Sequence, residues 1–518
     1  MKHLNKPKSM KKALPIILLI LSLAACKDLD TVNNNNPDRN AVLTTGSDLL
    51  TVLQGGYIAW WQGVHDDHPV IALSVTGDAY GMGWANFGAE RMGEEPRIPY
   101  NNRASEENDY QQVVKDPWFG CLSAVSSAND VIAAIDKGVT IDNGGPQDEA
   151  ILAAAHFLRA VSWGYLGLLF DQTFLVDENT DLGKPLTLVP YTEVIPAAIT
   201  DLEMAIMLAE SSDISFIHEY FNGLRLGSED FVQLCHSYAA RFLTQWPRTE
   251  QEKALVDWTA VLAHAELGLT FDFAPIADGK FWQSYQSYVF AEAGIGPFWA
   301  RVDQRLVAAL DPSQPTRYPE VIAKGEPPLS NPEANSADKR LETDFLYFPT
   351  NNFPPDRGEW HYSHYKHNRN ITDPTFAGDG SSSGPMPVFL AADNDLLRAE
   401  ALLALNRSPE AVAIINAGTR VTRGELPPLG PAAAFAEVDR AIRYERAIEL
   451  LSTAPMSLWL DRRRNGPRLS YLEVDDLGGL QIGTPAQLPV PAEELRIQGL
   501  APYNFGGPLD PEGVVAVF

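Results

Sequence analysis

The stretch "DEAILAAAHFLRAVSWGYLGLLF", residues 148–170, decides the fold class. From Ile151 to Phe170 it is strongly apolar, and only His156 and Arg159 interrupt it with strongly polar groups. A helix that is apolar around most of its circumference is one that a protein buries on several sides. The stretch therefore predicts a buried helix inside a helical protein.

Helical periodicity continues along the chain, whereas strand-like alternation is scarce. In segment 434–452, Phe435, Val438, Ile442 and Ile448 or Leu451 mark one apolar stripe. A helix is also expected from Ser47, as N-cap, through "DLLTVLQGGYIAWW". The same spacing predicts further helices at about 118–137, 191–210, 229–246, 251–266, 387–405 and 408–422.

The helices are expected to form one domain, residues 45–518. Short loops between several helix pairs predict antiparallel hairpins stacked like tetratricopeptide units, although no clean repeat is visible. The fold class predicted is all-α, with tetratricopeptide-like helical hairpins at about 45–62, 105–266 and 387–466. Regions 63–104 and 268–386 are irregular and rich in aromatic residues, which is typical of ligand-binding loops.

The composition excludes one class of partner. The chain has 518 residues and a formal net charge of −27. Its first 25 residues hold five Lys and no acid, so their removal would make the remainder more negative still. A charge excess of this size repels phosphate backbones, so nucleic acid is not an expected partner.

The N-terminus is predicted to be a lipoprotein signal peptide, residues 1–25. Five Lys precede the apolar run "ALPIILLILSLAA", which is too short to span a bilayer. The following "LAAC" resembles the lipobox of bacterial lipoproteins, which implies that Cys26 is acylated and becomes the first mature residue. Lys27 and Asp28 resemble the signal that sends lipoproteins of the Bacteroidota to the cell surface. Residues 26–44 then form a polar tether.

Several separated stretches resemble the SusD/RagB family of nutrient-binding outer-membrane lipoproteins. "DPWFGCLSAVSSANDVIAAID" is similar to an early family helix, with Trp118 and Asn129 in place. Phe157 to Ala160 match a second helix, and the "DLxxA" of the next helix begins at Asp201. Towards the C-terminus the family's order continues through "NDLLRAEALLAL", "INAGTRVTRG", "IRYERAIELL", "SLWLDRRRNG" and "LPVPAEELRIQG".

The resemblance implies four tetratricopeptide-like hairpins that support an irregular, ligand-binding subdomain. It also implies a lid on a SusC-like, TonB-dependent transporter in the outer membrane, facing the cell exterior, and a ligand that is an oligosaccharide or a peptide. The sequence departs from the family where "STAPMS" follows "EL", and in the stretched spacing of Arg420 and Arg423. The ligand therefore cannot be inherited from the starch-binding founder of the family.

Sugar binding requires flat apolar faces together with amide and charged groups. In the first irregular region, Tyr80, Trp84, Asn86 and Arg91 offer this combination. The second irregular region adds Trp282, Tyr285, Trp360 and Tyr362. For each aromatic residue, core packing or contact with the transporter is the alternative to ligand binding. Trp60 and Trp61 lie on a predicted helix, so core packing is the expectation for these two.

Three patterns could indicate a metal, and none is strong. His361, His364 and His367 recur at every third residue and could gather around Zn²⁺, and "HDDH" at 65–68 is weaker. "DENTDLG", residues 177–183, resembles the front half of a calcium loop but lacks the expected later Glu. The prediction is no metal or other cofactor, with calcium as the alternative.

Nothing in the sequence points to catalysis. There is no nucleophile elbow, no zinc-protease motif and no phosphate-cradling loop. Glu445 and Glu449 share a helix face and could act as an acid–base pair, but Arg443, Arg446 and the run Arg462–Arg464 favour structural ion pairs. The prediction is a binding protein; a glycoside hydrolase and a purely structural helical scaffold are the alternatives.

Two cysteines remain if Cys26 is acylated. Cys121 and Cys235 both lie in helical patterns, which favours two buried thiols over a disulfide.

Overall fold

The structure is a computed structural model that describes residues 43–82, 86–103, 106, 108–283, 300–317, 331–349, 361–369, 383–472 and 477–518. The chain divides into two compact units, Met1–Thr44 and Thr45–Phe518. All of the helices and strands below belong to the second unit. Cys26 and the predicted signal peptide lie outside the described residues.

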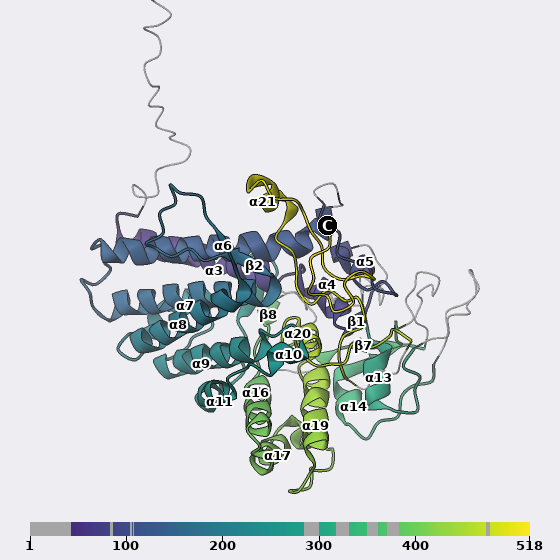
Figure 1. Cartoon of the computed structure of the whole chain (residues 1–518). Coiled ribbons are helices and arrows are strands. Elements are labelled where there is room, and N and C mark those ends of the chain that lie inside the picture. Colours follow the sequence, from purple (N-terminus) through teal and green to yellow (C-terminus); the bar gives the residue numbers. More distant parts are fainter. Residues whose placement is uncertain are drawn as a thin grey trace, which may run out of the picture. The chain divides into compact units, whose positions relative to one another are not determined.

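Antiparallel helices stack in sequence order and form the scaffold (Figure 1). Each helix packs on the next one in the series α3, α6, α7, α8, α9, α11 and α16. The last of these, α16, packs on both α17 and α19. This arrangement confirms the all-α prediction of stacked helical hairpins. The scaffold helices are α3 (Gly46–Val64), α6 (Asn108–Asp136), α7 (Pro146–Leu169), α8 (Tyr191–Ala209), α9 (Ser228–Gln245), α11 (Trp258–Glu266), α16 (Ala391–Ala404), α17 (Ser408–Ala417) and α19 (Phe435–Ile448).

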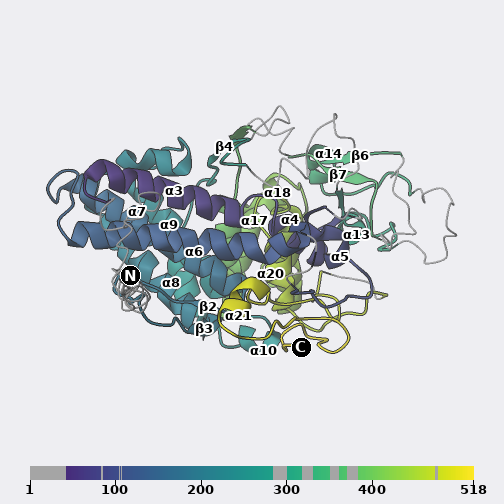
Figure 2. The same ribbon diagram turned by 90° about the horizontal axis from the view of Figure 1, so that it is seen from above.

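Helix α7 is buried on several sides, as its sequence predicts. It packs on α6 and α8 and also contacts α3 and α9 (Figure 2). Close packing uses its glycines: a Cβ added at Gly164 would lie 2.1 Å from Cε2 of Phe242 on α9. By length and composition, α7 and residues Tyr110–Asp136 of α6 could each cross a membrane, but 89% of the apolar window of α7 is buried inside the protein. Such burial is what the core helix of a helical stack shows.

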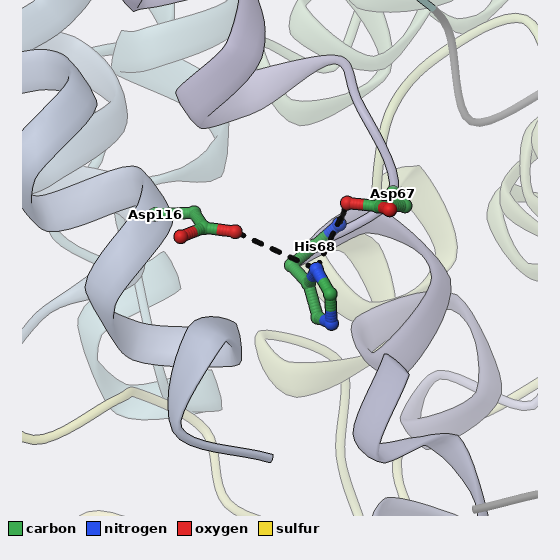
Figure 3. Close-up of side chains that lie close together, drawn as sticks. All are labelled: Asp67, His68 and Asp116. Atoms are coloured by element: carbon green, nitrogen blue, oxygen red, sulfur yellow. Dashed lines mark hydrogen bonds and ion pairs between the residues drawn. The ribbon is translucent and has the colours of Figure 1, made fainter. Parts of the chain in front are cut away.

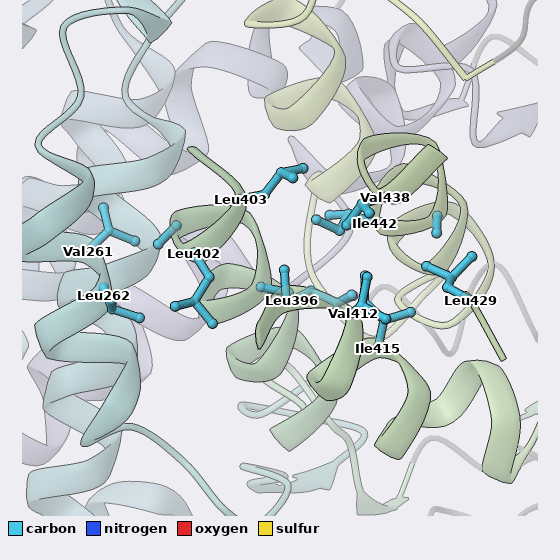
Figure 4. Packing of buried hydrophobic residues seen from close by; sticks show 14 of the residues in the cluster. Val261, Leu262, Leu396, Leu402, Leu403, Val412, Ile415, Leu429, Val438 and Ile442 are labelled. Carbon is cyan, nitrogen blue, oxygen red and sulfur yellow. The ribbon is translucent and has the colours of Figure 1, made fainter. Parts of the chain in front are cut away.

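A second apolar core joins α11 to the C-terminal helices. Leu262 on α11, Leu402 on α16, Ile415 on α17 and Ile442 on α19 all belong to one cluster of buried residues (Figure 4). The stripe expected in segment 434–452 is therefore mostly correct, with Val438 and Ile442 buried. Phe435, by contrast, is 57% exposed at the start of α19.

Helix boundaries differ from the expected ones where local chemistry overrides periodicity. The expected helix 251–266 is two, α10 (Glu250–Lys253) and α11, because Asp257 caps a new start by accepting hydrogen bonds from two backbone N–H groups. Gly418 likewise separates α17 from the short α18 (Thr419–Thr422). Helix α3 begins two residues earlier than expected, with Thr45 rather than Ser47 as its N-cap.

One small two-stranded ladder joins the two irregular regions, although about 200 residues separate its strands in sequence. Strand β1 (Tyr80–Gly81) pairs antiparallel with β5 (Arg301–Val302), and Asp303 bridges to Tyr362. The other ladders pair β2 with β3, β4 with β8 and β6 with β7. The irregular regions also hold β4 (Ile276–Asp278), β6 (Phe345–Tyr347), β7 (Tyr365–His367), β8 (Ser383–Pro385), α4 (Val70–Thr76), η1 (Asn86–Gly88), α5 (Ala89–Met92), α13 (Gln304–Leu310) and α14 (Arg340–Asp344). The short elements elsewhere in the chain are β2 (Gln172–Phe174), β3 (Leu188–Pro190), η2 (Ile214–Phe221), α20 (Ser457–Arg463) and α21 (Ala492–Ile497).

A buried carboxylate ties these irregular regions to the scaffold. Asp78 accepts hydrogen bonds from Arg97 and Arg305, each at 2.7 Å, and from Arg462 of α20 at 3.1 Å. The four side chains are all at most 5% exposed. Because a charge in the interior must be compensated, this junction fixes the first irregular region, the second one and α20 together.

Candidate functional site

The residues expected to bind ligand fall into three groups in the structure. Trp84, Tyr285 and Trp360 lie outside the described residues. Asn86 begins the 3-10 turn η1, and its side chain is likewise not described. As ligand-binding residues, these four stay predictions.

Three of the expected aromatic residues are buried inside the protein. Tyr80 and Tyr362 are 3% and 1% exposed, and the hydroxyl of Tyr80 hydrogen-bonds with Ser452. Trp282 is 2% exposed, and its ring centroid lies 4.7 Å from that of Trp61. In this conformation the three side chains pack inside the protein, which is one of the alternatives to ligand binding given for each aromatic residue. Contact with a ligand would therefore require local opening. Trp60 and Trp61, expected to pack, are fully buried.

Arg91 is exposed but already engaged. Its guanidinium pairs with Glu106 and lies 5.0 Å from the ring centroid of Tyr110 on α6. A ligand would have to compete with the carboxylate of Glu106. As a ligand-binding residue, Arg91 stays a prediction.

The junction of the two irregular regions holds an arginine that sequence reasoning missed. Arg301 on β5 pairs across the ladder with Gly81, and a Cβ added at Gly81 would lie 3.0 Å from Cα of Tyr362. The Arg301 guanidinium carbon is 4.4 Å from the ring centroid of Phe348 and 5.7 Å from that of Tyr362. No short motif marks Arg301, because its surroundings come from three distant segments.

Arg301 is fully buried, yet in the described part of the chain no acceptor hydrogen-bonds to its Nε, Nη1 or Nη2. Burial lowers the pKa of its guanidinium, and the hydroxyl of Tyr362 opposes this effect only in part. Cation–π contacts contribute about 0.5–2 kcal/mol. An ion buried without a partner costs several kcal/mol, so these contacts do not compensate the charge.

An open groove of about 670 Å³ follows the contact between α3 and α6. Its walls include Gln62, Asp66 and Asp67 on one side and Asp116 and Phe119 of α6 on the other. The ring of Phe119 is 42% exposed, so the groove offers an apolar surface beside several carboxylates. These groups could contact the C–H faces and hydroxyls of a sugar.

Three potential metal ligands meet beside this groove (Figure 3). His68 Nδ1 lies 2.8 Å from Asp67 Oδ1 and 3.5 Å from Asp116 Oδ2, and the ligand atoms of the three residues all lie within 4.8 Å of one another. One imidazole and two carboxylates could hold a divalent ion such as Zn²⁺ or Mn²⁺. The motif "HDDH", judged weak in the sequence, supplies two of the three residues, and no periodicity could have added Asp116.

The carboxyl groups of the groove titrate at different pH values. Burial, together with the charge of Asp67, raises the pKa of Asp66 to about 7. Burial also raises the pKa of Asp116 to about 6, and the charge of His68 opposes this shift. For Asp67 burial acts in the same direction, but the hydrogen bonds and charge of His68 outweigh it and lower the pKa.

The other expected metal patterns use their side chains internally. His361 Nδ1 lies 3.0 Å from Glu95 Oε1, whereas His364 contacts the backbone of Phe348 and Asn331. The three histidines do not form a common ligand set in the described residues. In "DENTDLG", Asp177 and Asp181 accept hydrogen bonds from residues of their own turn, which is how a polar turn is built.

Glu445 and Glu449 belong to a buried ion-pair network, as expected, but with other arginines. Arg340 donates to both oxygens of Glu445, at 2.8 and 2.9 Å. Arg423 and Arg369 pair with Glu449 at 2.7 and 2.9 Å. The network borders a cavity of about 300 Å³ between α16, α17 and α19.

The expected partners of these glutamates were wrong. Arg443 pairs with Asp439, and Arg446 pairs with Glu400 and Asp461. The arginines that reach Glu445 and Glu449 come instead from segments that are distant in sequence, so neighbourhood in the sequence could not identify them.

Cys121 and Cys235 are free and buried, which confirms the expectation of two buried thiols.

Comparison with known proteins identifies the fold. A SusD homolog from Bacteroides thetaiotaomicron has a TM-score of 0.60 at 15% identity, and the match covers 88% of this chain and 96% of that one. A SusD-like carbohydrate binding protein from Bacteroides fragilis has a TM-score of 0.58 at 15% identity, with coverage of 88% and 99%. A SusD superfamily protein from Parabacteroides distasonis has a TM-score of 0.58 at 14% identity, with coverage of 88% and 97%.

No family model matches the sequence, and no curated protein matches it. The likeness to solved structures therefore rests on shape, and it covers nearly the whole length of each. The chain has the SusD-like fold, as the resemblance of its motifs implied.

Proposed function

We propose that this chain is a cell-surface lipoprotein of the SusD/RagB family that captures a nutrient, an oligosaccharide, and delivers it to a SusC-like, TonB-dependent transporter. The observation that carries the proposal is the SusD-like fold over 88% of the chain, because one matching structure is described as a carbohydrate binding protein. The lipobox-like "LAAC" supports attachment to the outer membrane through Cys26.

The anchor is tested by expressing the full chain in a host of the Bacteroidota. The wild type should partition with the outer membrane, and Cys26→Ala should leave the protein unacylated and released from it. Asp28→Ala is the matched control, since it leaves Cys26 intact; it should remain acylated but lose labelling by a membrane-impermeant reagent on intact cells. Membrane attachment of Cys26→Ala would contradict the proposed anchor.

Capture is tested by screening the purified protein against a panel of oligosaccharides and peptides. We expect binding of at least one oligosaccharide without turnover, and weaker binding by Trp84→Ala. Binding of peptides alone would reject the glycan ligand. No binding at all would favour the structural scaffold.

Delivery is tested by solubilising membranes in mild detergent and isolating the tagged chain. A large β-barrel transporter should co-purify with it. Repeated isolation of the chain alone would contradict the partnership.

A second candidate function, a glycoside hydrolase, is favoured by one observation. Asp67 and Asp116 both line the groove and lie 2.8 and 3.5 Å from His68 Nδ1, and their pKa values are shifted in opposite directions. Two neighbouring carboxyl groups with separated pKa values can divide acid and base roles between them. Products released from oligosaccharides, and lost in Asp116→Asn, would establish this activity.

A further inference from the structure

Arg301 is unusual among the buried arginines of this protein. Among the described residues, six arginines are less than 2% exposed, and the other five each donate hydrogen bonds to carboxylates or backbone carbonyls: Arg248, Arg340, Arg462, Arg463 and Arg464. Arg301 donates none within the described residues. A guanidinium carries five N–H donors, so its position calls for an acceptor.

Asp303 and Glu95, two acids of the irregular regions, already pair with other groups. Asp303, two residues further along, accepts from Arg305 with both of its oxygens, at 2.9 and 2.8 Å. Glu95 pairs with His361 at 3.0 Å and accepts from Gln481 at 2.8 Å. The described part of the chain thus offers Arg301 aromatic rings rather than a carboxylate.

We propose that Arg301 binds the oxyanion of an acidic glycan, so that the nutrient captured by this protein carries carboxylate or sulfate groups. This inference rests on the proposed function and specifies its substrate class. The planar guanidinium matches a carboxylate or sulfate with two parallel hydrogen bonds. The compensation that Arg301 lacks within the chain is then supplied by the ligand.

The aromatic neighbours favour an acidic sugar over other anions. Phe348 and Tyr362 both lie beside the guanidinium, and aromatic faces pack against the C–H patches of a pyranose ring. In a uronic acid, one short molecule carries both the C–H face and the carboxylate. Arg301 and the two rings can therefore recognise neighbouring parts of one sugar residue.

One of the two rings beside the buried guanidinium reaches the surface. The ring of Phe348, 4.4 Å from the guanidinium carbon, is only partly buried. Rotation of this side chain would open the space next to Arg301 and leave the ring available to pack on the sugar.

The first test compares acidic glycans with neutral counterparts on the wild-type protein. The panel holds oligouronates and their methyl esters, sialylated glycans and their asialo forms, and sulfated glycans and their desulfated forms. Calorimetric titration at about 0.15 M salt screens the net negative charge of the protein beyond about 8 Å. At least one acidic probe should bind about tenfold or more tightly than its neutral form, which is the strength of charge-assisted hydrogen bonds. The carboxylated and sulfated arms show which oxyanion is preferred.

The second test replaces the charge itself. Arg301→Gln should remove the preference for the acidic probe, whereas Arg301→Lys should retain part of it, because it keeps the charge and loses the planar fork. Arg407→Gln is the control, since Arg407 is an exposed arginine paired with Glu410 and should change nothing. Without ligand, the thermal midpoint of Arg301→Gln should equal or exceed that of the wild type.

Four results would overturn the inference. If neutral glycans bind as well as or better than every acidic form, Arg301 does not recognise an anion, although the protein remains a glycan-binding protein. If Arg301→Gln melts below the wild type and keeps its preference, the partner of Arg301 is an acid of the chain itself. A complete lack of glycan binding would reject the proposed function together with this inference. Binding confined to acidic peptides would show that Arg301 recognises a peptide carboxylate and not a glycan.

Discussion

Replacing Asp66 by Asn should stabilise the protein at alkaline pH and not at acid pH. The pKa of Asp66 is about 7 in the folded protein against 3.8 for the free group, because burial and the charge of Asp67 disfavour its ionised form. A group whose folded pKa is raised in this way binds its proton more tightly in the folded state. Stability therefore falls as the pH rises from about 4 to about 7, and is then constant.

The magnitude follows from the same pKa. At 1.36 kcal/mol for each pH unit, the full difference would be about 4 kcal/mol. The groove is open to solvent, since the side chain of its neighbour Asp67 is 24% exposed. We therefore expect solvent screening to halve the effect, to about 2 kcal/mol. For a unit of this length, an unfolding entropy of roughly 1 kcal/mol per kelvin converts this into a rise of about 2 °C.

The assay is calorimetric melting of the wild type and Asp66→Asn at pH 4 and pH 8. Asn keeps the oxygen that accepts the 2.9 Å hydrogen bond from the Asp67 backbone, so the comparison isolates the charge. Asp142→Asn is the control, and its effect on stability should have the opposite sign. Hydrogen bonds from the backbone of Gln147 and of neighbouring residues lower the pKa of Asp142, so its ionised form is favoured in the folded protein. That variant should be less stable than the wild type at pH 8 and approach it at acid pH. An equal shift of Asp66→Asn at both pH values, or its destabilisation at pH 8, would refute the reasoning.

Two further predictions concern groups outside the groove. Asp78→Asn removes the charge that three buried arginines share, so it should cost about 3–5 kcal/mol of unfolding free energy in urea titrations; a loss below about 1 kcal/mol would show that the arginines find other partners. His236 and His264 lie with their Nδ1 atoms 2.9 Å apart, and burial, with the charge of His264, lowers the pKa of His236 to about 4. Stability should therefore fall as the pH drops from about 6.5 to about 4, and His236→Gln should reduce this fall; an unchanged pH profile would contradict it.

The fold could be predicted because its evidence is local. Apolar periodicity identifies the scaffold helices, and the surroundings of Arg159 on α7 show why the interrupting polar residues are tolerated: its Nη2 donates to Asp201 of α8 at 2.9 Å, and its Nη1 donates to Asn129 of α6 at 2.8 Å. The motifs that resemble the SusD/RagB family include these three residues. They mark contacts between consecutive helices, which is why they predict architecture.

The candidate site could be predicted only in part, because burial is not local. Trp282 and Tyr362 were expected in binding loops for their aromatic rings, and both are packed inside the protein. Residue type alone cannot separate a ring that binds a sugar from one that fills a core. The cluster around His68 could be identified only in part for a related reason: "HDDH" contains Asp67 and His68, whereas Asp116 comes from the distant helix α6.

Strand β5 and the residues that follow it link the junction at Asp78 to the proposed site at Arg301. Asp303 and Arg305 are committed to the junction at Asp78, which holds the irregular regions to the scaffold. Arg301, on the same short segment, is held at the same depth and receives no such partner among the described residues. Arg301 itself pairs with Gly81 in the ladder between β5 and β1, and a donor whose backbone is already positioned loses less entropy when an acceptor arrives. A buried charge that is fixed in place but not compensated costs stability in the free protein, and that cost is recovered when an anion binds. This is the arrangement that the proposed site requires. The ladder between β5 and β1 positions the backbone of Arg301, and an acidic ligand compensates the charge of its guanidinium.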